Sequence, residues 1–241
     1  MNTRISAYTL SVFIFAGFVF SPTPPADGAV LFFDTIAGLN QPVRLTVLTR
    51  GKILARGGQR VDIFLDRTRI AGILTGGDGY GYFKYIPRKT GRLTIDVRSS
   101  GEKGSGILLV VDPSVSALFV DVETCLAKTL FSPKTTAGMK QALTALGEKY
   151  RLVYLTRFLG ISLTRILLAK SALPESVVLR WQGAATLDEL KQTGLRLHAM
   201  IASAEMLAEA AEYIENRYAF EDTEAGTPVD DWDALMKRLY P

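Results

Sequence analysis

The sequence has 241 residues, enough for one or two domains with a sizeable core. Hydrophobic residues make up 48% and charged residues 22%, with 21 Gly and 10 Pro, which excludes wholesale disorder, a collagen repeat and a coiled coil. One cysteine and one histidine exclude an intramolecular disulfide framework, a thiolate-only zinc site and a multi-histidine metal site. The net charge of +4 is uneven: residues 29–113 hold 13 Lys/Arg against 7 Asp/Glu, and residues 114–241 hold 14 against 16. This contrast indicates a multidomain chain.

The N-terminal segment, residues 1–28, has the pattern of a secretory signal peptide. A positive start at Arg4 precedes a charge-free, strongly apolar run over residues 5–20, a proline-rich stretch and small residues at the −3 and −1 positions. This order predicts cleavage before Ala29 and export to the periplasm or the extracellular space. An uncleaved N-terminal anchor is the alternative, since the apolar run is only slightly shorter than a membrane span. No later run is long enough, so no transmembrane segment is expected after cleavage.

Residues 29–113 alternate apolar and polar side chains in short runs that are bounded by Gly, Asn, Asp or Pro. Such runs, repeated at short spacing, are typical of the strands of a β-sandwich. The predicted strands cover residues 43–49, 59–66, 70–75, 80–85, 92–98 and 106–112. We therefore expect an all-β sandwich of the size of one immunoglobulin domain.

Three motifs in this region resemble those of bacterial immunoglobulin-like domains. They are GQRVDIFLD at residues 58–66, Thr75 with DGYGYF at residues 78–83, and the turn YIPRKTG at residues 85–91. The resemblance covers most of residues 40–112. It implies a spacer or adhesive module.

Basic side chains are concentrated in the predicted sandwich. They are Arg44, Arg50, Lys52, Arg56, Arg60, Arg67 and Arg69. They offer a surface for an anionic lipid or polymer, or for a protein or other envelope partner, and the alternative is an ordinary solvated strand face. Aromatic residues do not alternate with these charges as they do in a base-stacking platform, so no nucleic acid is expected as a partner.

Residues 114–241 change to apolar strands separated by segments of helical periodicity. The predicted strands cover residues 116–121, 151–156, 176–180 and 197–201, and the predicted helices cover residues 134–150, 162–170, 186–191, 205–216 and 229–239. This alternation predicts an α/β domain with a parallel sheet. Ligands of such sheets bind at the C-terminal ends of the strands, which here are marked by Asp121, Thr156 and Ser203.

The segment LFVDVETCL, at residues 118–126, resembles the first motif of the haloacid dehalogenase-like (HAD) hydrolases. That motif is an apolar strand followed by Asp-x-Asp-x-Thr. Thr156, at the end of the next apolar strand, resembles the second motif. The short spacing between the two is similar to that of the cap-poor, lipin-like phosphatidate phosphatase branch. The resemblance spans residues 114–240 and implies a Rossmann-type HAD-like domain.

This resemblance implies phosphoryl transfer through an aspartyl-phosphate. By position in the motifs, Asp121 corresponds to the nucleophile and Glu123 to the general acid/base. Thr156 and Lys191 correspond to the groups that hold the phosphoryl oxygens, with Arg180 as the alternative to Lys191. The implied cofactor is Mg²⁺, for which Asp121 and Glu123 are the candidate ligands. The implied substrates are phosphoesters or lipid headgroups.

Two departures from the family motifs weaken the predicted site. Glu123 replaces an Asp, and its extra methylene displaces the carboxyl group by roughly one C–C bond, enough to impair catalysis. After the fourth strand the chain has Ala202 and Ser203 where the family has an acidic Mg²⁺ ligand. The sequence therefore predicts a non-catalytic or impaired phosphatase-like binding module, a pseudoenzyme. The alternatives are an active Mg²⁺-dependent phosphatase that works through Asp121, and a purely structural adhesin-like module.

The remaining residues with chemical potential are expected to serve packing. His198 lies within a predicted strand and has no second histidine, and Cys125 has no evident base to lower its pKa. We expect a core or edge histidine and a small buried filler.

Overall fold

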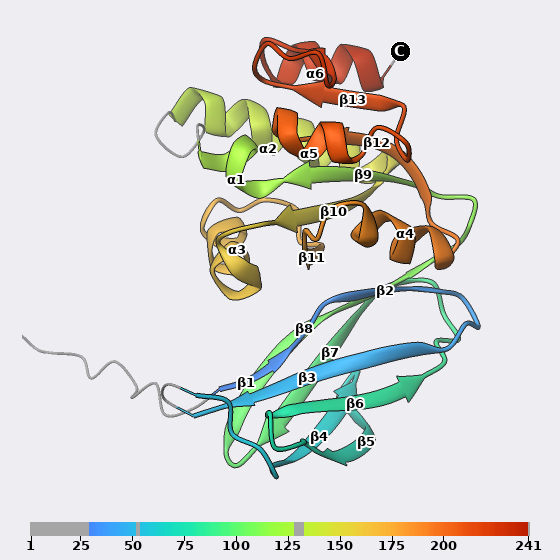
Figure 1. Cartoon of the computed structure of the whole chain (residues 1–241), viewed down its shortest axis with the longest axis vertical. Helices are drawn as coiled ribbons and strands as arrows, with labels where there is room; N and C mark the ends of the chain where they lie inside the picture. The colour runs from blue at the N-terminus through green and yellow to red at the C-terminus, as the bar shows by residue number, and fades with distance from the viewer. Residues whose placement is uncertain (1–28, 52–53, 128–132, 241) are drawn as a thin grey trace, which may run out of the picture.

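The computed structural model describes residues 29–51, 54–127 and 133–240. The predicted signal segment, residues 1–28, and Lys52 lie outside them. The described chain forms two stacked units, a β-sandwich and an α/β unit above it (Figure 1). No helix in the described ranges is long and apolar enough to cross a membrane.

The sandwich consists of two sheets. The three-stranded antiparallel sheet has the order β1 (Ala29–Phe32), β3 (Val43–Arg50) and β6 (Tyr80–Tyr85). The five-stranded sheet has the order β2 (Thr35–Gly38), β8 (Glu102–Val111), β7 (Gly91–Ser99), β4 (Arg60–Leu65) and β5 (Thr68–Leu74). Alternate side chains meet between the sheets, among them the fully buried Leu45, Val47, Ile63, Ile95 and Leu108. This confirms the predicted immunoglobulin-like sandwich and adds β1 and β2, which the sequence pattern did not indicate.

The threonine and the Asp-Gly turn of the sandwich motif fix one corner of this unit. The Thr75 hydroxyl is buried, accepts the N–H of Gln59 at 3.0 Å and lies 3.2 Å from the Thr49 hydroxyl. The Asp78 carboxylate accepts the N–H of Tyr80 at 3.0 Å. Gly79 has φ +80°, and a Cβ there would lie 2.6 Å from the Thr49 carbonyl oxygen. The motif therefore fixes the turn from β5 into β6 against the end of β3.

The α/β unit is built on a six-stranded sheet in which every neighbouring pair is parallel. Its order is β11 (Val177–Arg180), β10 (Arg151–Thr156), β9 (Ser116–Asp121), β12 (Arg196–Ile201), β13 (Asn216–Ala219) and β14 (Thr227–Pro228). Strand β9, the first of this unit in the chain, lies in the middle of the sheet, and the strand order reverses direction there. This is the doubly wound arrangement, and it confirms the predicted parallel sheet.

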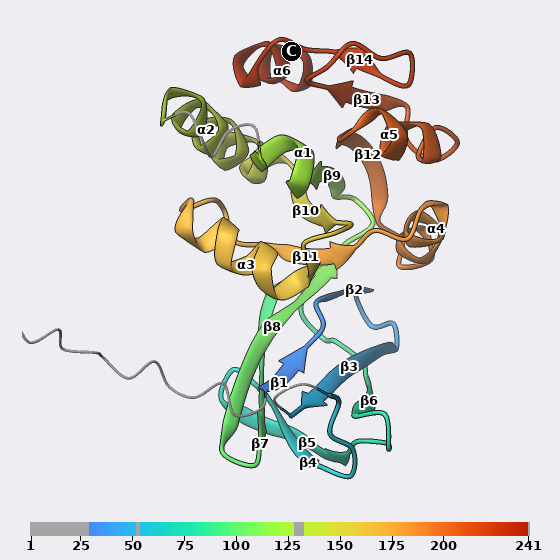
Figure 2. The same ribbon diagram turned by 60° about the vertical axis from the view of Figure 1, so that its left-hand side comes forward.

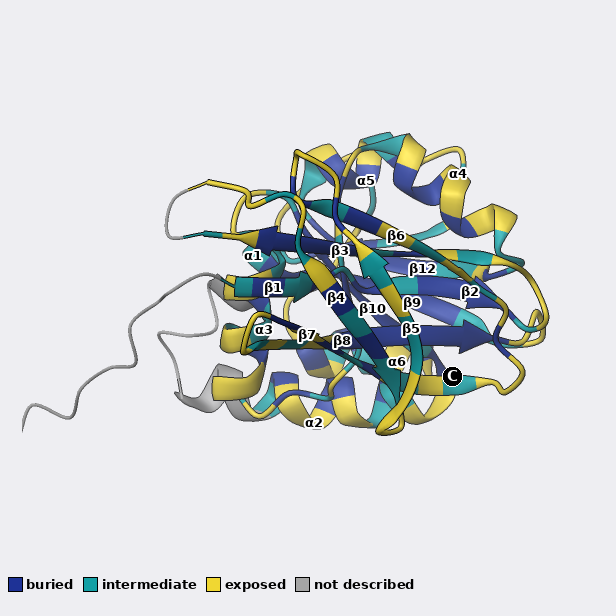
Figure 3. Cartoon of the chain, turned by 90° about the horizontal axis from the view of Figure 1, so that it is seen from below, coloured by how far each residue is buried: buried dark blue, intermediate teal, exposed yellow. Residues whose placement is uncertain are grey.

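Helices cover both faces of this sheet. They are α1 (Val122–Ala127), α2 (Pro133–Lys149), α3 (Gly160–Lys170), α4 (Ala184–Gln192), α5 (Ala204–Glu209) and α6 (Trp232–Leu239). Side chains of α2, α3 and α6 pack on one face, and those of α4 and α5 pack on the other. The central strands are accordingly buried, while α2, α4 and α5 turn exposed sides outward (Figure 3).

The predicted helix over residues 205–216 is wrong in its second half. Helix α5 ends at Glu209, and β13 begins at Asn216. The Arg217 guanidinium donates to the carbonyl oxygens of Ile214 at 2.6 Å and Ala225 at 2.8 Å. These bonds satisfy the backbone acceptors of the turn and hold the following residues as a strand beside β12. The helical periodicity of the segment gives no sign of this turn.

The two units share a packed junction (Figure 2). The Asp34 carboxylate, between β1 and β2, has no exposed side-chain surface and accepts the N–H groups of Ile107 at 2.5 Å and Val178 at 2.8 Å. It also forms an ion pair with Arg165 of α3. Burial raises the pKa of Asp34, and Arg165 and the two N–H groups only partly offset that rise. One carboxylate therefore joins β8 of the sandwich to β11 and α3 of the other unit.

Candidate functional site

The polar strand ends meet where the strand order of the parallel sheet reverses. Asp121 ends β9, Thr156 ends β10, and Ser203 follows β12, so the three lie at the same edge of neighbouring strands. This is the position at which doubly wound sheets bind ligands. The sequence order of strands thus brings Asp121, Glu123 and Thr156 together, as their spacing predicts.

Asp121 is 2% exposed, and both of its oxygens accept backbone hydrogen bonds. Oδ1 accepts the N–H of Glu123 at 3.1 Å and of Thr124 at 3.4 Å, and Oδ2 accepts the N–H of Ser203 at 3.3 Å. Burial raises the pKa of Asp121, and the neighbouring Glu123 carboxylate adds to the rise, while the Thr124 and Ser203 donors oppose it. The carboxyl group of Asp121, the predicted nucleophile, is therefore pushed toward its neutral form.

Glu123 lies in the first turn of α1, and its carboxylate is held by four donors. Oε1 accepts the Thr156 hydroxyl at 2.6 Å. It also accepts the N–H groups of Arg157, Phe158 and Leu159, each at 3.0 Å. Burial acts to raise the pKa of Glu123, but these four donors outweigh it and hold the pKa below its usual value. Glu123 therefore occupies an anion cradle formed by the loop before α3.

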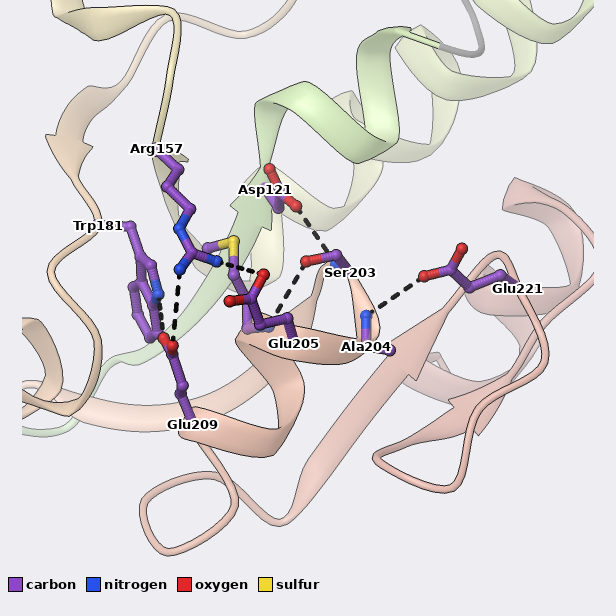
Figure 4. Close-up of polar contacts among 9 residues, drawn as sticks. Asp121, Arg157, Trp181, Ser203, Ala204, Glu205, Glu209 and Glu221 are labelled. Carbon is purple, nitrogen blue, oxygen red and sulfur yellow. Dashed lines mark hydrogen bonds and ion pairs between the residues drawn. The ribbon is translucent and has the colours of Figure 1, made fainter.

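The end of β12 carries no carboxylate, and the nearest acidic side chains are already engaged. Ser203 caps α5 by accepting the N–H of Met206. Glu205 forms an ion pair with Arg157 at 2.6 Å, and Glu209 accepts the Trp181 indole N–H at 2.6 Å and lies 3.9 Å from Arg157 (Figure 4). These contacts hold α5 to the β10 loop and leave its carboxylates turned toward Arg157.

The donor set at these strand ends does not fit Mg²⁺. The ion requires several oxygen ligands in near-ideal octahedral geometry. Glu123 Oε1 already accepts four hydrogen bonds, which leaves only its buried Oε2, and Ser203 and Ala204 stand where a second acid would be needed. No group of three or more His, Cys, Asp or Glu side chains in the described part of the chain is arranged to hold a metal.

Lys191 is not brought to this cluster. It lies in the last turn of α4, which runs back to the opposite edge of the sheet before β12 begins. Just after α4, Thr193 and Gly194 approach Gly38 and Pro113 at the junction with the sandwich. Because a helix that precedes a parallel strand must return to that strand's N-terminal end, its last turn cannot reach the strand tips.

Arg180, the alternative to Lys191, is closer to the predicted position. It ends β11 and is the register partner of Thr156 on β10. Its side chain lines a hollow between α3 and the sandwich.

His198 and Cys125 have packing environments, as predicted. The His198 ring stacks on Tyr150 with centroids 5.0 Å apart, and partial burial, Arg196 and Lys149 lower its pKa. Cys125 is buried, and its Sγ lies 3.7 Å from the Ile201 carbonyl oxygen.

Sequence reasoning missed two charged residues beside the site. Arg157, directly after Thr156, forms the ion pairs with α5. Glu221, two residues beyond β13, accepts the N–H of Ala204 at 3.3 Å. Both residues lie within two positions after the end of a strand, and that position was the available signal. Glu221 was missed because β13 was not predicted as a strand.

Comparison with known proteins assigns no family to the chain. No family model and no curated protein matches the sequence. Among solved structures, the chain is similar to the D00-D0 domain of intimin, with 13% identity, a TM-score of 0.29, and 36% of this chain and 48% of that chain covered. Domains 4 and 5 of the S-layer protein SbsC give 14% identity, a TM-score of 0.28, and 35% and 51% covered. A carbohydrate acetylesterase from Xanthomonas citri gives 14% identity, a TM-score of 0.28, and 77% and 48% covered. The chain thus spans about half the length of these three structures.

Proposed function

We propose that this chain is an exported two-domain protein whose α/β domain is phosphatase-like in its strand-end arrangement but serves as a non-hydrolytic binding module. The observation that carries the proposal is the Glu123 carboxylate, which occupies the Thr156 hydroxyl and three consecutive backbone N–H groups. Those donors are the ones that a bound oxyanion would need. Export is proposed from the N-terminal sequence pattern.

Hydrolysis through an aspartyl-phosphate requires an ionised nucleophile and a carboxyl group that is free to move a proton to the leaving oxygen. Burial and the Glu123 carboxylate favour the neutral form of Asp121. Glu123 is fixed by its four donors in the ionised form, so it has no proton to donate. Lys191 lies at the other edge of the sheet. The surroundings of Asp121 and of Glu123 therefore oppose both requirements, and Lys191 is too far away to hold a phosphoryl oxygen.

The proposed ligands are a phosphoester or an anionic component of the cell envelope, bound outside the cradle that Glu123 occupies. The basic side chains of the sandwich provide an attractive surface for such partners, and long-range attraction of this kind speeds association. In this proposal the sandwich positions the α/β unit, to which it is joined through Asp34 and Arg165.

The test is a hydrolysis assay on a soluble aryl phosphate and on phosphatidate, with millimolar Mg²⁺ and without it. We expect no turnover above that of the Asp121→Asn variant. The matched control is Asp112→Asn, which changes an exposed carboxylate that accepts the Ser114 N–H at 2.9 Å. Turnover that Asp121→Asn abolishes and Asp112→Asn preserves would overturn the proposal in favour of an active phosphatase.

A second measurement examines assembly of the site without turnover. Beryllofluoride imitates a phosphoryl group on an aspartate and requires Mg²⁺. We expect the melting temperature to be unchanged by the two together, because the strand-end donors do not fit the metal. A stabilisation that Asp121→Asn removes would contradict that expectation.

A further inference from the structure

The outer side of α3 and the loop before it is apolar and exposed. Phe158 is 81% exposed, Leu163 56% and Ile166 51%. Leu163 and Ile166 are three residues apart and so lie on one side of α3, whose opposite side buries Thr164 and Leu168, and Phe158 lies in the loop just before the helix. Soluble proteins rarely turn a continuous apolar helix stripe outward unless it binds something. We call Phe158, Leu163 and Ile166 the α3 stripe.

A hollow of about 370 Å³ continues the α3 stripe onto the sandwich. Its sandwich wall is mostly apolar and aromatic, and its members are Leu31, Phe32, Phe33, Leu48 and Tyr80. Phe33 stacks on Tyr80, which stacks on Tyr82, with ring centroids 6.0 and 6.5 Å apart. Of these residues, Leu31, Phe33 and Tyr80 are partly exposed, so an apolar wall of the hollow continues onto the sandwich on the side where α3 lies above β1 (Figure 1).

The charge of the hollow is positive. Arg50 at the end of β3, Arg165 of α3 and Arg180 at the end of β11 line it, and none of its described lining residues is acidic. Because Arg165 forms an ion pair with Asp34, the positive charge of the hollow comes from Arg50 and Arg180. An occupant of this face therefore combines apolar groups with negative charge.

We propose that this face docks onto a lipid surface that carries anionic headgroups. In this arrangement the α3 stripe enters the acyl region, and Arg50 and Arg180 contact lipid phosphates. Side chains that protrude from a convex helix suit a fluid surface, which needs no shape-matched slot. The proposal is independent of whether the strand-end site hydrolyses phosphoesters, because no side chain of that cluster takes part.

The course of the chain supports the same orientation. The described residues begin at Ala29 in β1, and Leu31 of that strand lines the hollow. In the alternative in which the N-terminal segment is not cleaved, the charge-free apolar run at residues 5–20 comes shortly before this strand in the sequence. The polypeptide therefore enters the fold beside the face that we assign to lipid.

The test uses the full chain with an environment-sensitive fluorophore at Ser162→Cys, an exposed position on α3, while Cys125 is buried. Vesicles of phosphatidylcholine mixed with phosphatidylglycerol are compared with phosphatidylcholine alone. We expect a blue shift with the anionic vesicles that weakens as salt is added. A probe on α3 reports on this face even if the N-terminal run also binds lipid.

Leu163→Asp combined with Ile166→Asp should weaken the vesicle response about tenfold or more, because apolar burial is lost and charge is introduced. The matched control is Leu74→Asp on β5, which is 71% exposed and lies away from the α3 stripe, and it should leave the response unchanged. Circular dichroism checks that both variants fold.

Three outcomes would overturn the proposal. The fluorophore does not respond to anionic vesicles, or the double variant responds as strongly as Leu74→Asp. Alternatively, the emission shifts with protein concentration in the absence of vesicles, which would assign the face to a second copy of the chain.

Discussion

The domain junction and the strand-end site each contain a buried aspartate, and the two carboxyl groups have different hydrogen-bond and charge partners. Asp34 at the domain junction and Asp121 at the strand ends are both almost inaccessible, and burial raises the pKa of each. Asp34 has a guanidinium partner and two short backbone N–H bonds. Asp121 has longer N–H bonds and a second carboxylate beside it. The contacts of Asp34 oppose the effect of burial on its pKa, whereas the Glu123 carboxylate beside Asp121 adds to that effect.

The largest effect is expected at the junction. Asp34→Ala leaves Arg165 without its carboxylate and removes the acceptor of two buried N–H groups, so the free energy of unfolding should fall by about 3 kcal/mol. Urea unfolding followed by the fluorescence of Trp181 and Trp232 measures it. The matched control, Asp62→Ala, removes a partly exposed surface carboxylate paired with Arg69 and should cost much less than Asp34→Ala. Equal losses in the two variants would show that the junction does not depend on Asp34.

An intermediate effect is expected at the anion cradle. Glu123→Ala leaves the Thr156 hydroxyl and the N–H groups of the loop before α3 without their acceptor, and should cost about 1–2 kcal/mol at neutral pH. Glu123→Gln keeps one acceptor and should cost less. Thermal melting of both variants distinguishes the stability lost with the hydrogen-bond acceptor from the stability lost with the negative charge.

The same cradle gives a pH dependence with a defined sign. Because the pKa of folded Glu123 is lowered, its carboxylate contributes stability above the ordinary value of 4.5, and this contribution is lost as the pH falls through the folded pKa. The stability difference between wild type and Glu123→Gln should therefore shrink below about pH 4.5. A difference that grows on acidification would mean that the cradle does not favour the charged form.

The smallest effect is expected at the strand ends. Asp121→Asn should leave the free energy of unfolding within about 1 kcal/mol of wild type, because the amide oxygen can still accept the N–H groups of Glu123 and Thr124. The pKa of Asp121 is raised, so the wild type loses stability as the pH rises through it, and the Asn variant does not. The variant should gain relative to wild type with rising pH. If Asp121→Asn lowered the free energy of unfolding as much as Asp34→Ala does, the two buried aspartates would contribute equally to stability, contrary to this expectation.

Prediction from sequence succeeded where the pattern was long and local. The period-two runs of the sandwich and the apolar strands that end at Asp121 and Thr156 lie where the sequence places them. It failed at three of the short strands, although it found the equally short β11. Strands β1, β2 and β13 have four residues each, too few to show a period, and β13 follows a segment with helical spacing.

The sequence alone determined that Asp121, Glu123 and Thr156 share one edge of a sheet, since the strand–helix alternation predicts parallel strands and the C-terminal ends of parallel strands lie at the same edge. Only the tertiary structure decided what each carboxylate does there. Glu123 turns into the cradle before α3 and Lys191 is carried to the opposite edge, because side-chain direction and helix return depend on packing between distant segments. The role of Asp34 was likewise decided by tertiary structure, since its partners Ile107, Arg165 and Val178 follow it by at least 73 residues in the chain.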